Sequence, residues 1–224
     1  FMRKFLTATL LCMALTVTMV PAAFAADTAD SNYTTCMAAI QEQKVIQDQA
    51  HQTAESLRQK GYDDSSAYIQ AAQSTWWAAQ DEIVAYQKLS QYTDEDIRIL
   101  TTAVFYEAGH TTEQLREYVA QVVLNRVADS RFPDTVKGVI TQPGQYATKY
   151  ATQAATDSIK SADSQNGTYY YAMCETAVKK AMMGQVDMPS NVLYQANFAQ
   201  GKGVWQSVYF NSGWYASTSY FCYG

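Results

Sequence analysis

Basic residues are scarce in this chain, and their scarcity excludes several classes of protein. The 224 residues contain 16 Lys and Arg against 21 Asp and Glu, with only 2 His. Loss of Arg3 and Lys4, which lie in an N-terminal segment expected to be cleaved, leaves 14 basic residues and a net charge of 14 − 21 = −7. Nucleic acids and anionic membrane surfaces require a basic face, so neither is an expected partner. Uncharged or zwitterionic ligands fit such a chain better.

Histidine and cysteine are also too few, and too poorly placed, for most metal chemistry. No Cys-x-x-Cys pair occurs, and the histidines are His51 and His110. Glu107 and His110 have the Glu-x-x-His spacing of some iron-binding helical bundles, but Gly109 interrupts the helix that this form needs, and no second copy exists. His51 has no acidic partner at a matching spacing. No metal or other cofactor is expected, and His110 is predicted to be solvated at a helix end.

Nucleophilic catalysis lacks its usual signatures as well. The chain has no Gly-x-Ser-x-Gly sequence. A catalytic thiol needs a histidine base, yet Cys174 lies on the apolar face of its predicted helix and Cys222 lies near the end of the sequence. A disulfide between these two is our prediction because both fall in the C-terminal block. The alternative is that Cys36, Cys174 and Cys222 are all free and buried.

The first 25 residues have the organisation of a signal peptide. Residues 3–4 are basic, residues 5–20 are mostly apolar, and residues 23–25 read Ala-Phe-Ala, which matches the small-x-small cleavage pattern. Cleavage near Ala25 would export the protein. A retained membrane anchor fits less well, because threonines interrupt the apolar run and Pro21 follows it at once.

Residues 26–92 are predicted to form an antiparallel helical hairpin. No proline occurs from residue 33 to residue 92, and apolar or small residues recur at alternating spacings of three and four. Residues 61–64, Gly-Tyr-Asp-Asp, provide a turn between the two runs. An apolar seam is first of all a packing device, so a packing extension is favoured, with a partner-binding arm as the alternative. Because the seam can be satisfied within the two helices, residues from Tyr92 onward are expected to fold alone.

Residues 93–224 are predicted to form an α-rich α+β domain. Thr93 and the acidic residues 94–96 begin a helix that reaches Glu107 and stops at Gly109. Thr111 and Gln114 resemble the capping box of a second helix, so two helices meet at Glu107.

The rest of this domain combines one turn, one loop, one helix and a small sheet. Residues 142–145 predict a turn, the stretch to about residue 167 predicts a long surface loop, and a helix then ends at Gly184. Three short aromatic segments are expected to form a small antiparallel sheet: residues 192–198, 204–210 and 217–223.

Glu107 follows two aromatic residues, Phe105 and Tyr106, at the junction of these helices. Packing a carboxyl group against apolar rings raises its pKa and keeps a proton available near neutral pH, as a general acid requires. A glycosidase with two carboxylates would need a second one about 5–9.5 Å away, but Glu113 and Glu117 are expected to face solvent. Residue patterns alone leave Glu107 as either a solvated helix-end carboxylate or the catalytic acid.

Five short motifs follow one another around and after this glutamate. They are Tyr106-Glu107-Ala108, Val123-Leu124-Asn125-Arg126-Val127, Phe132-Pro133, Val139-Ile140 and Pro143-Gly144-Gln145-Tyr146. In this order they resemble the core of the SleB-type cell-wall hydrolases, the family that includes the spore-cortex-lytic enzymes. The likeness covers about residues 94–224 and weakens after Gln145, where Tyr194 and Asn197 match the family's Leu-Tyr-Tyr-x-Asn segment.

The resemblance implies a lysozyme-like fold and a lytic transglycosylase that acts on peptidoglycan glycan strands. Such an enzyme cleaves the β-1,4 bond between N-acetylmuramic acid and N-acetylglucosamine and closes a 1,6-anhydro ring, and the family's catalytic acid falls on Glu107. It also implies a location outside the cell, at the wall or in the spore. The predicted substrate-binding residues are Tyr106, Asn125, Gln145, Tyr146, Tyr194 and Asn197. A buried amide that braces the Glu107 turn is the alternative role of Asn125.

Two other functions stay open from the sequence. One is a hydrolytic muramidase that uses the same site with water as the attacking group. The other is a non-catalytic wall-binding protein, whose hairpin recruits a protein partner and whose site only grips glycan.

Overall fold

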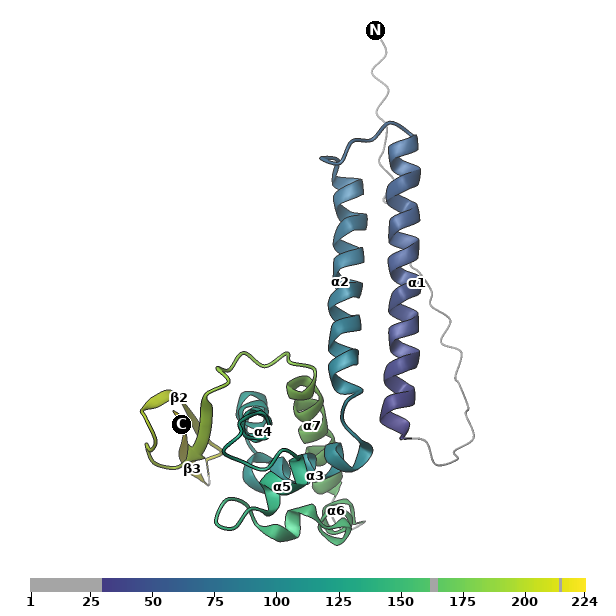
Figure 1. Cartoon of the computed structure of the whole chain (residues 1–224). Helices are drawn as coiled ribbons and strands as arrows, with labels where there is room; N and C mark the ends of the chain where they lie inside the picture. Colours follow the sequence, from purple (N-terminus) through teal and green to yellow (C-terminus); the bar gives the residue numbers. More distant parts are fainter. Residues whose placement is uncertain (1–29, 162–164, 214) are drawn as a thin grey trace.

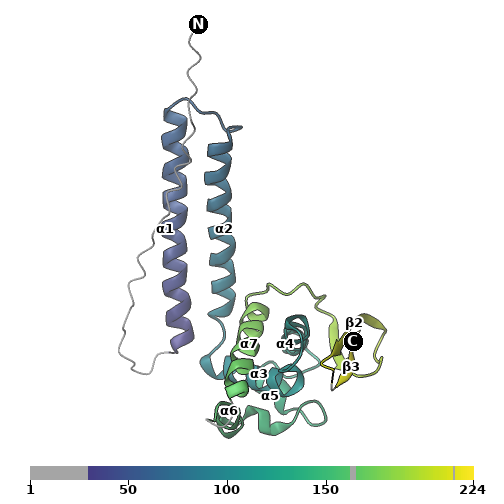
Figure 2. The same cartoon turned by 180° about the vertical axis from the view of Figure 1, so that it is seen from behind.

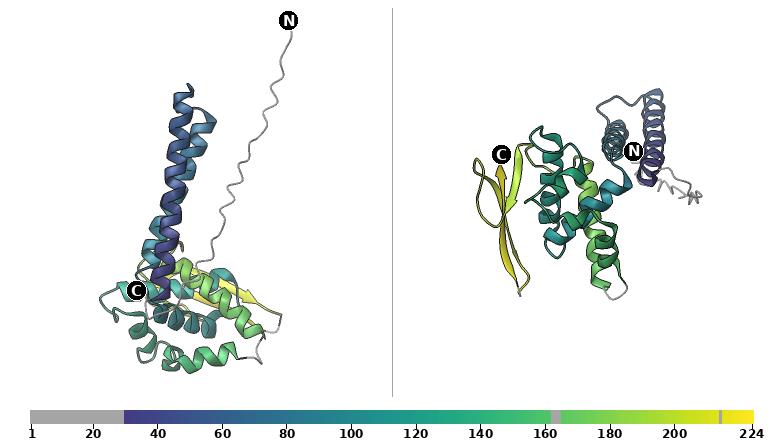
Figure 3. Two further views of the ribbon diagram at one scale, coloured as in Figure 1. Left: turned by 90° about the vertical axis from the view of Figure 1, so that its right-hand side faces the viewer. Right: turned by 60° about the horizontal axis from the view of Figure 1, so that its bottom comes forward.

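The computed structural model describes residues 30–161, 165–213 and 215–224. A long helical hairpin stands on one side of a helical domain, and a small sheet lies on the other side (Figures 1 and 3). The predicted α-rich α+β fold with an antiparallel sheet behind a helical hairpin is confirmed. The predicted signal peptide, residues 1–25, lies outside the described residues. Within the described ranges, no helix is both long and apolar enough to cross a membrane.

The hairpin consists of α1 (Ser31–Gln59) and α2 (Ala67–Leu89). Asp30 and Ser66 cap the two helices, each with a side chain that accepts a backbone N–H of the first turn. Gly61, with a φ of 86°, supplies the left-handed residue that the turn between them requires. The predicted seam is buried where the helices face each other: Ile40, Ala50 and Ala54 on α1, and Ile69, Ala72, Ala79 and Ile83 on α2.

The base of the hairpin is joined to the helical domain. The Asn32 side-chain amide donates to the carbonyl oxygens of Leu89, at 2.9 Å, and Tyr92, at 2.7 Å. The backbone N–H of Asn32 donates to the Asp94 carboxylate at 3.1 Å. Cys36 and Leu89 belong to the same buried cluster as the core of the domain. The seam is therefore not satisfied within the hairpin at its base, contrary to our expectation, while the domain boundary near residue 92 stays a prediction.

Two helices meet at Glu107, as predicted. Helix α3 (Asp94–Ala108) begins with a complete capping box between Thr93 and Asp96. Helix α4 (Glu113–Ala128) is capped by Thr112, whose side chain accepts from the backbone N–H of Leu115 at 3.2 Å. The predicted cap at Thr111 is wrong by one residue, because the Thr111 hydroxyl instead donates to the Ala108 carbonyl at 2.6 Å and closes the end of α3.

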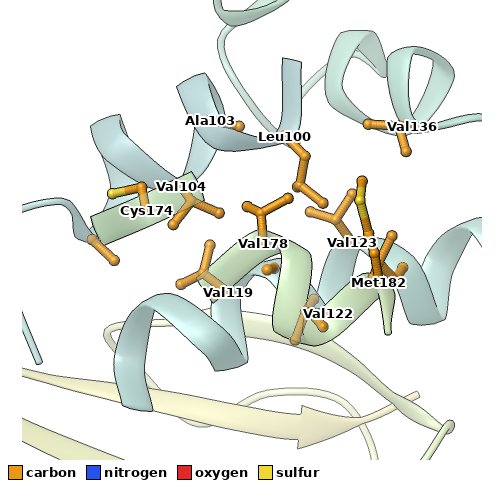
Figure 4. Close-up of a cluster of buried hydrophobic side chains, with 14 of the residues drawn as sticks. Leu100, Ala103, Val104, Val119, Val122, Val123, Val136, Cys174, Val178 and Met182 are labelled. Carbon is orange, nitrogen blue, oxygen red and sulfur yellow. The ribbon is translucent and has the colours of Figure 1, made fainter. Parts of the chain in front are cut away.

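Helices α3, α4 and α7 (Gln165–Met182) pack around one apolar core. The short helix α5 (Val136–Thr141) also contributes side chains to this core. Figure 4 shows side chains from these four helices meeting in it: Leu100, Ala103, Val104, Val119, Val122, Val123, Val136, Cys174, Val178 and Met182. Full burial of a Val or Leu side chain contributes roughly 1.5–3 kcal/mol. This core fixes the position of α3, and with it the position of Glu107.

The predicted surface loop from Tyr146 to about residue 167 is wrong. The 3-10 helix η1 (Thr148–Ala151) and helix α6 (Gln153–Lys160) occupy most of it, and α7 already begins at Gln165. The side chain of Thr152 caps α6 by accepting from the backbone N–H of Ala155. Threonine and alanine suggested a loop by composition, but here threonine serves as a cap and alanine as a helix former.

The three predicted strands are confirmed as β1 (Val192–Ala196), β2 (Val204–Asn211) and β3 (Ala216–Tyr223). Their order is β1-β3-β2, with both pairs antiparallel. The sheet lies beside α4, on the side of the domain away from the hairpin (Figures 2 and 3). Tyr118 of α4 packs against Trp205 and Phe221, with ring centroids 5.1 and 5.2 Å apart.

The three cysteines of the described region are free and buried. The predicted bridge between Cys174 and Cys222 is therefore wrong. Cys174 points into the helical core (Figure 4), whereas Cys222 lies on β3, opposite Tyr194 and Val204. Burial raises the pKa of the Cys174 thiol to about 12, which keeps it protonated and unreactive.

Unfolding without reductant should therefore expose three reactive thiols. Alkylation in denaturant, read by mass spectrometry, is expected to label Cys36, Cys174 and Cys222, because none of them is consumed by a bridge. Alkylation of the folded protein without denaturant should leave the three thiols unlabelled, since all three are buried. Labelling of Cys36 alone in the unfolded chain would show that Cys174 and Cys222 are bridged after all.

The base of the hairpin should contribute measurably to stability. Asn32→Ala removes a buried amide and leaves the Leu89 and Tyr92 carbonyls without this donor, so the free energy of unfolding should fall by about 1–3 kcal/mol in chemical denaturation. Thr53→Ala is the control, because the exposed Thr53 hydroxyl bonds only within α1. Its effect should stay within about 0.5 kcal/mol. Equal losses in the two variants would contradict a structural role for Asn32.

Candidate active site

Glu107 lies where α3 emerges from the core. From Ile97 to Val104 the helix is buried at every position except Arg98, whereas Tyr106 and Glu107 are exposed in its last turn. By helical spacing, Glu107 continues the stripe of Leu100 and Val104, so the protein interior lies directly beneath it.

Arg116 holds the chain that follows Glu107. This arginine is buried, with 2% of its surface exposed, and its Nη1 donates to the carbonyl oxygens of Gly109, at 3.3 Å, and Thr111, at 2.5 Å. The Thr111 hydroxyl adds its bond to the end of α3. The connection between α3 and α4 is therefore fixed from the inside, which limits the positions that Glu107 can take.

The pKa of the Glu107 carboxyl is raised above its usual value. Burial is the main cause, because the protein around the carboxyl group disfavours its charged form even though one side of the residue reaches solvent. Hydrogen bonding from the Tyr150 hydroxyl favours the charged form and opposes the rise. No second carboxylate of the described residues contributes to the shift. A raised pKa is the property that a general acid needs, and the catalytic role of Glu107 stays a prediction.

Two tyrosines form a flat wall beside this carboxyl group. The rings of Tyr106 and Tyr150 are stacked, with centroids 4.6 Å apart and planes 6° apart. The ammonium group of Lys149 lies 5.3 Å from the centroid of the Tyr106 ring. Lys149 and Tyr150 belong to η1, so the helix that the sequence did not predict completes this wall.

Arg126 is a buried cation among aromatic rings. Its Nε donates to the Leu193 carbonyl of β1 at 2.6 Å. Its guanidinium carbon lies 5.3, 5.6 and 5.8 Å from the ring centroids of Phe132, Tyr146 and Tyr194, within cation–π range. Arg126 therefore links α4, the chain after α4, the chain after α5 and β1.

Tyr146 lies near Arg126 and within the electrostatic influence of Glu107. Burial raises the pKa of the Tyr146 phenol to about 12, while the positive charge of Arg126 lowers it and the negative charge of Glu107 raises it. The phenol stays protonated near neutral pH and can act there as a hydrogen-bond donor.

The structure brings together only some of the predicted substrate-binding residues. Tyr106 and Tyr146 lie at Glu107, and Tyr194 lies with Tyr146 around Arg126. Gln145 is exposed in the turn after α5, and Asn197 is exposed just beyond β1. Binding of sugar by these residues stays a prediction.

Asn125 is buried and its amide is engaged by protein. Its nitrogen donates to the carbonyl oxygens of Pro189 and Val192, both at 2.9 Å, and its oxygen accepts from the Gln121 side chain at 2.9 Å. Asn125 thus holds the chain that leads into β1 against α4, whereas the turn after Glu107 is held by Arg116. A contact between Asn125 and sugar stays a prediction.

Reasoning from the sequence missed Tyr150, Arg116 and Arg126 as site residues. Arg126 stood inside a quoted motif, and Arg116 precedes Val119 and Val123 by three and seven residues, a spacing that already placed it on a buried face. Tyr150 gave no such signal, because its position depends on how η1 folds back onto α3.

The other acidic and histidine candidates have different surroundings. Glu113 and Glu117 both accept hydrogen bonds from the Lys180 ammonium group of α7. His110 is exposed and packs edge-on against Phe105 and Tyr170. Over the described ranges, no group of three or more metal-ligating side chains comes together.

Comparison with known proteins identifies relatives of this region. Residues 112–218 match the model of a family described as Cell Wall Hydrolase; the match begins just after Glu107. A spore cortex-lytic enzyme of Halalkalibacterium halodurans is 34% identical over 114 residues, which cover 44% of this chain and 34% of that protein. A spore cortex-lytic enzyme of Bacillus cereus is 35% identical over 100 residues, which cover 40% of this chain and 39% of that protein.

A solved structure is also similar. The catalytic domain of the Bacillus cereus SleB protein is matched over 58% of this chain and 91% of that domain, with 27% identity and a TM-score of 0.38. The chain spans less than two fifths of the length of the curated relatives that it matches. The match of residues 112–218 to the cell wall hydrolase model and the similarity to spore cortex-lytic enzymes confirm the resemblance seen in the sequence.

Proposed function

We propose that this protein is a peptidoglycan lytic transglycosylase and that Glu107 serves first as its general acid and then as its general base. The bond cleaved is the β-1,4 bond between N-acetylmuramic acid and N-acetylglucosamine. The observation that carries the proposal is the raised pKa of a single carboxyl group beside the stacked Tyr106 and Tyr150. The likeness to cell wall hydrolases and spore cortex-lytic enzymes supports peptidoglycan as the substrate.

The chemistry follows from one proton that leaves Glu107 and returns to it. The protonated carboxyl group donates its proton to the oxygen of the leaving N-acetylglucosamine as the bond from the anomeric carbon breaks. Positive charge then develops at that carbon, where the neighbouring N-acetyl group can stabilise it. The Glu107 carboxylate next takes the proton of the muramyl 6-hydroxyl, whose oxygen closes the 1,6-anhydro ring. No water is consumed, and no second carboxylate is required.

The neighbours of Glu107 have separate roles in this proposal. The stacked rings of Tyr106 and Tyr150 offer a flat apolar face on which a sugar ring can lie. The Tyr150 hydroxyl tunes the Glu107 pKa downward, so that the carboxyl group can also act as a base. Arg126 holds the rings of Tyr146 and Tyr194 in place through cation–π contacts.

A hydrolytic muramidase is the second candidate function. One observation favours it: Glu107 is exposed, so water can reach the anomeric carbon instead of the 6-hydroxyl. The two reactions differ by one water in their products, and the products therefore decide between them.

Replacement of Glu107 should abolish most of the activity on purified peptidoglycan. Glu107→Gln keeps the shape of the side chain but cannot cycle a proton, so the release of soluble fragments should fall by about 10²–10⁴-fold. Mass analysis of the wild-type fragments should show 1,6-anhydro ends, lighter by one water than reducing ends.

Glu113→Gln is the matched control, since this exposed glutamate pairs with Lys180. It should retain activity. Reducing ends alone would indicate the muramidase, and full activity of Glu107→Gln would reject both candidates.

Removal of the Tyr150 hydroxyl should shift the pH dependence upward. Activity that needs protonated Glu107 is lost as the pH rises through the pKa of this group. Because the hydroxyl lowers that pKa, Tyr150→Phe should raise it and move the alkaline limb of the kcat/KM profile to higher pH. Tyr209→Phe, an exposed tyrosine on β2, should leave the profile unchanged. A downward shift in Tyr150→Phe would contradict the proposed environment of Glu107.

A further inference from the structure

A second candidate site lies on the hairpin, in the half nearer to the turn at Gly61. A pocket of about 300 Å³ opens between α1 and α2, with Trp76 and Trp77 on one side. Its volume is at the lower end of the range of small-molecule sites. From Asn32, at the base of the hairpin, to Ala54, at the pocket, the chain rises about 33 Å along α1 at 1.5 Å per residue. The pocket is therefore remote from Glu107, as the projecting hairpin in Figure 1 shows.

The pocket exists because the seam is made of small residues at this level. Ala50, Ala54 and Ala72 line it, and their side chains are too short to fill the space between the helices. The buried cluster here is limited to Ala54, Ile69 and Ala72, with Leu57 against it. Neither tryptophan belongs to that cluster.

The two tryptophans form an open aromatic wall. Their rings meet edge to face, with centroids 4.8 Å apart and planes at 86°. Trp77 is 62% exposed, and Trp76 is half-buried. An exposed and a half-buried tryptophan next to an unfilled hollow leave apolar area in water that a ligand could cover.

The rim of the pocket is polar, but its charge is already compensated. The Arg58 guanidinium donates to Asp64 at 2.8 Å and to Glu55 at 2.5 Å. An anionic ligand would have to compete with these two carboxylates. Gln73 and His51 add exposed hydrogen-bonding groups. The rim therefore suits a neutral polar ligand better than an ion.

An aromatic wall, a floor of small residues and a polar rim whose one cation is already paired match the two sides of a sugar ring. The C–H face of a sugar stacks on indole rings, while its hydroxyl and acetamido groups bond to side chains such as Gln73 and His51. We propose that this tryptophan pocket, lined by Trp76 and Trp77, binds an N-acetylated sugar of a peptidoglycan strand as an anchoring site. The choice of polymer rests on the proposed function, whereas the class of ligand rests on the pocket itself.

Anchoring of this kind gives the distal hairpin a role in catalysis on an insoluble polymer. A second contact raises the local concentration of glycan at Glu107 without touching the reacting bond. Because the hairpin is tied to the domain by Asn32, the two sites keep a set distance. Loss of the pocket should therefore weaken action on intact wall but spare the cleavage of short soluble fragments.

Co-sedimentation of the full chain with purified insoluble peptidoglycan tests the pocket. The double variant Trp76→Ala/Trp77→Ala should bind at least tenfold more weakly, with its cleavage of soluble glycan fragments unchanged. Tyr68→Ala is the control, because Tyr68 is a 61% exposed aromatic on the same helix outside the pocket. Circular dichroism and thermal unfolding should show that both variants keep the helices. Unaltered sedimentation of the double variant, or equal weakening by Tyr68→Ala, would overturn the proposal.

Titration with a soluble oligomer of N-acetylglucosamine, followed by tryptophan fluorescence, tests the ligand class. The signal should change in the wild type and be lost in the double variant. Choline is the second probe, since paired tryptophans also bind quaternary ammonium groups. A response to choline without a response to the saccharide would reject a sugar as the ligand of the pocket. Failure of the wild type to cleave any glycan, with pocket-dependent sedimentation intact, would reject the proposed function and leave this inference standing.

Discussion

The burial of α3 among α4, α5 and α7 is the constraint on which the rest of the site depends. A helix buried on nearly all sides cannot rotate or slide, so the position of its last turn at the surface is fixed. Glu107 continues the buried stripe of Leu100 and Val104 and takes its raised pKa from the interior beneath it. The bonds of Arg116 to Gly109 and Thr111 then stop the end of the helix from fraying. The pKa of this carboxyl group is raised because the protein interior extends to its edge.

The two buried arginines show how positive charge is kept from lowering that pKa. The Arg116 guanidinium donates hydrogen bonds to backbone carbonyl oxygens. The Arg126 guanidinium donates to one carbonyl oxygen and makes cation–π contacts with the rings of Phe132, Tyr146 and Tyr194. A direct ion pair with Glu107 would favour the charged carboxylate and lower its pKa. Aromatic rings and carbonyls satisfy the arginines without supplying another carboxylate. The tyrosines around Glu107 therefore contribute to its electrostatic environment, in addition to their proposed role as a surface for sugar.

Local sequence patterns predicted most of the helices and strands. The features that they did not predict depend on tertiary contacts. The seams of the hairpin, the cap at Thr93 and the aromatic strands each left a pattern within a few residues of sequence, and the structure contains all of them. The stretch after Tyr146 was taken for a loop, because composition does not reveal that Thr152 caps a helix. For the site, Glu107 could be nominated from its aromatic neighbours and the family motifs. Tyr150 could not, because no local pattern brings η1 against the end of α3.

The hairpin shows that one apolar seam can serve different purposes along its length. At its base, Cys36 and Leu89 belong to the domain core, and the Asn32 side chain bonds to the Leu89 and Tyr92 carbonyls, so the hairpin is joined to the domain there. Farther out, Ile69 and Leu57 fill part of the seam, whereas Ala50, Ala54 and Ala72 let the helices approach but leave space between them. The two tryptophans border that space instead of filling it. Alanine at positions 50, 54 and 72 suits the close approach of the two helices, and the same small side chains leave beside Trp76 and Trp77 the hollow that the proposed sugar would occupy.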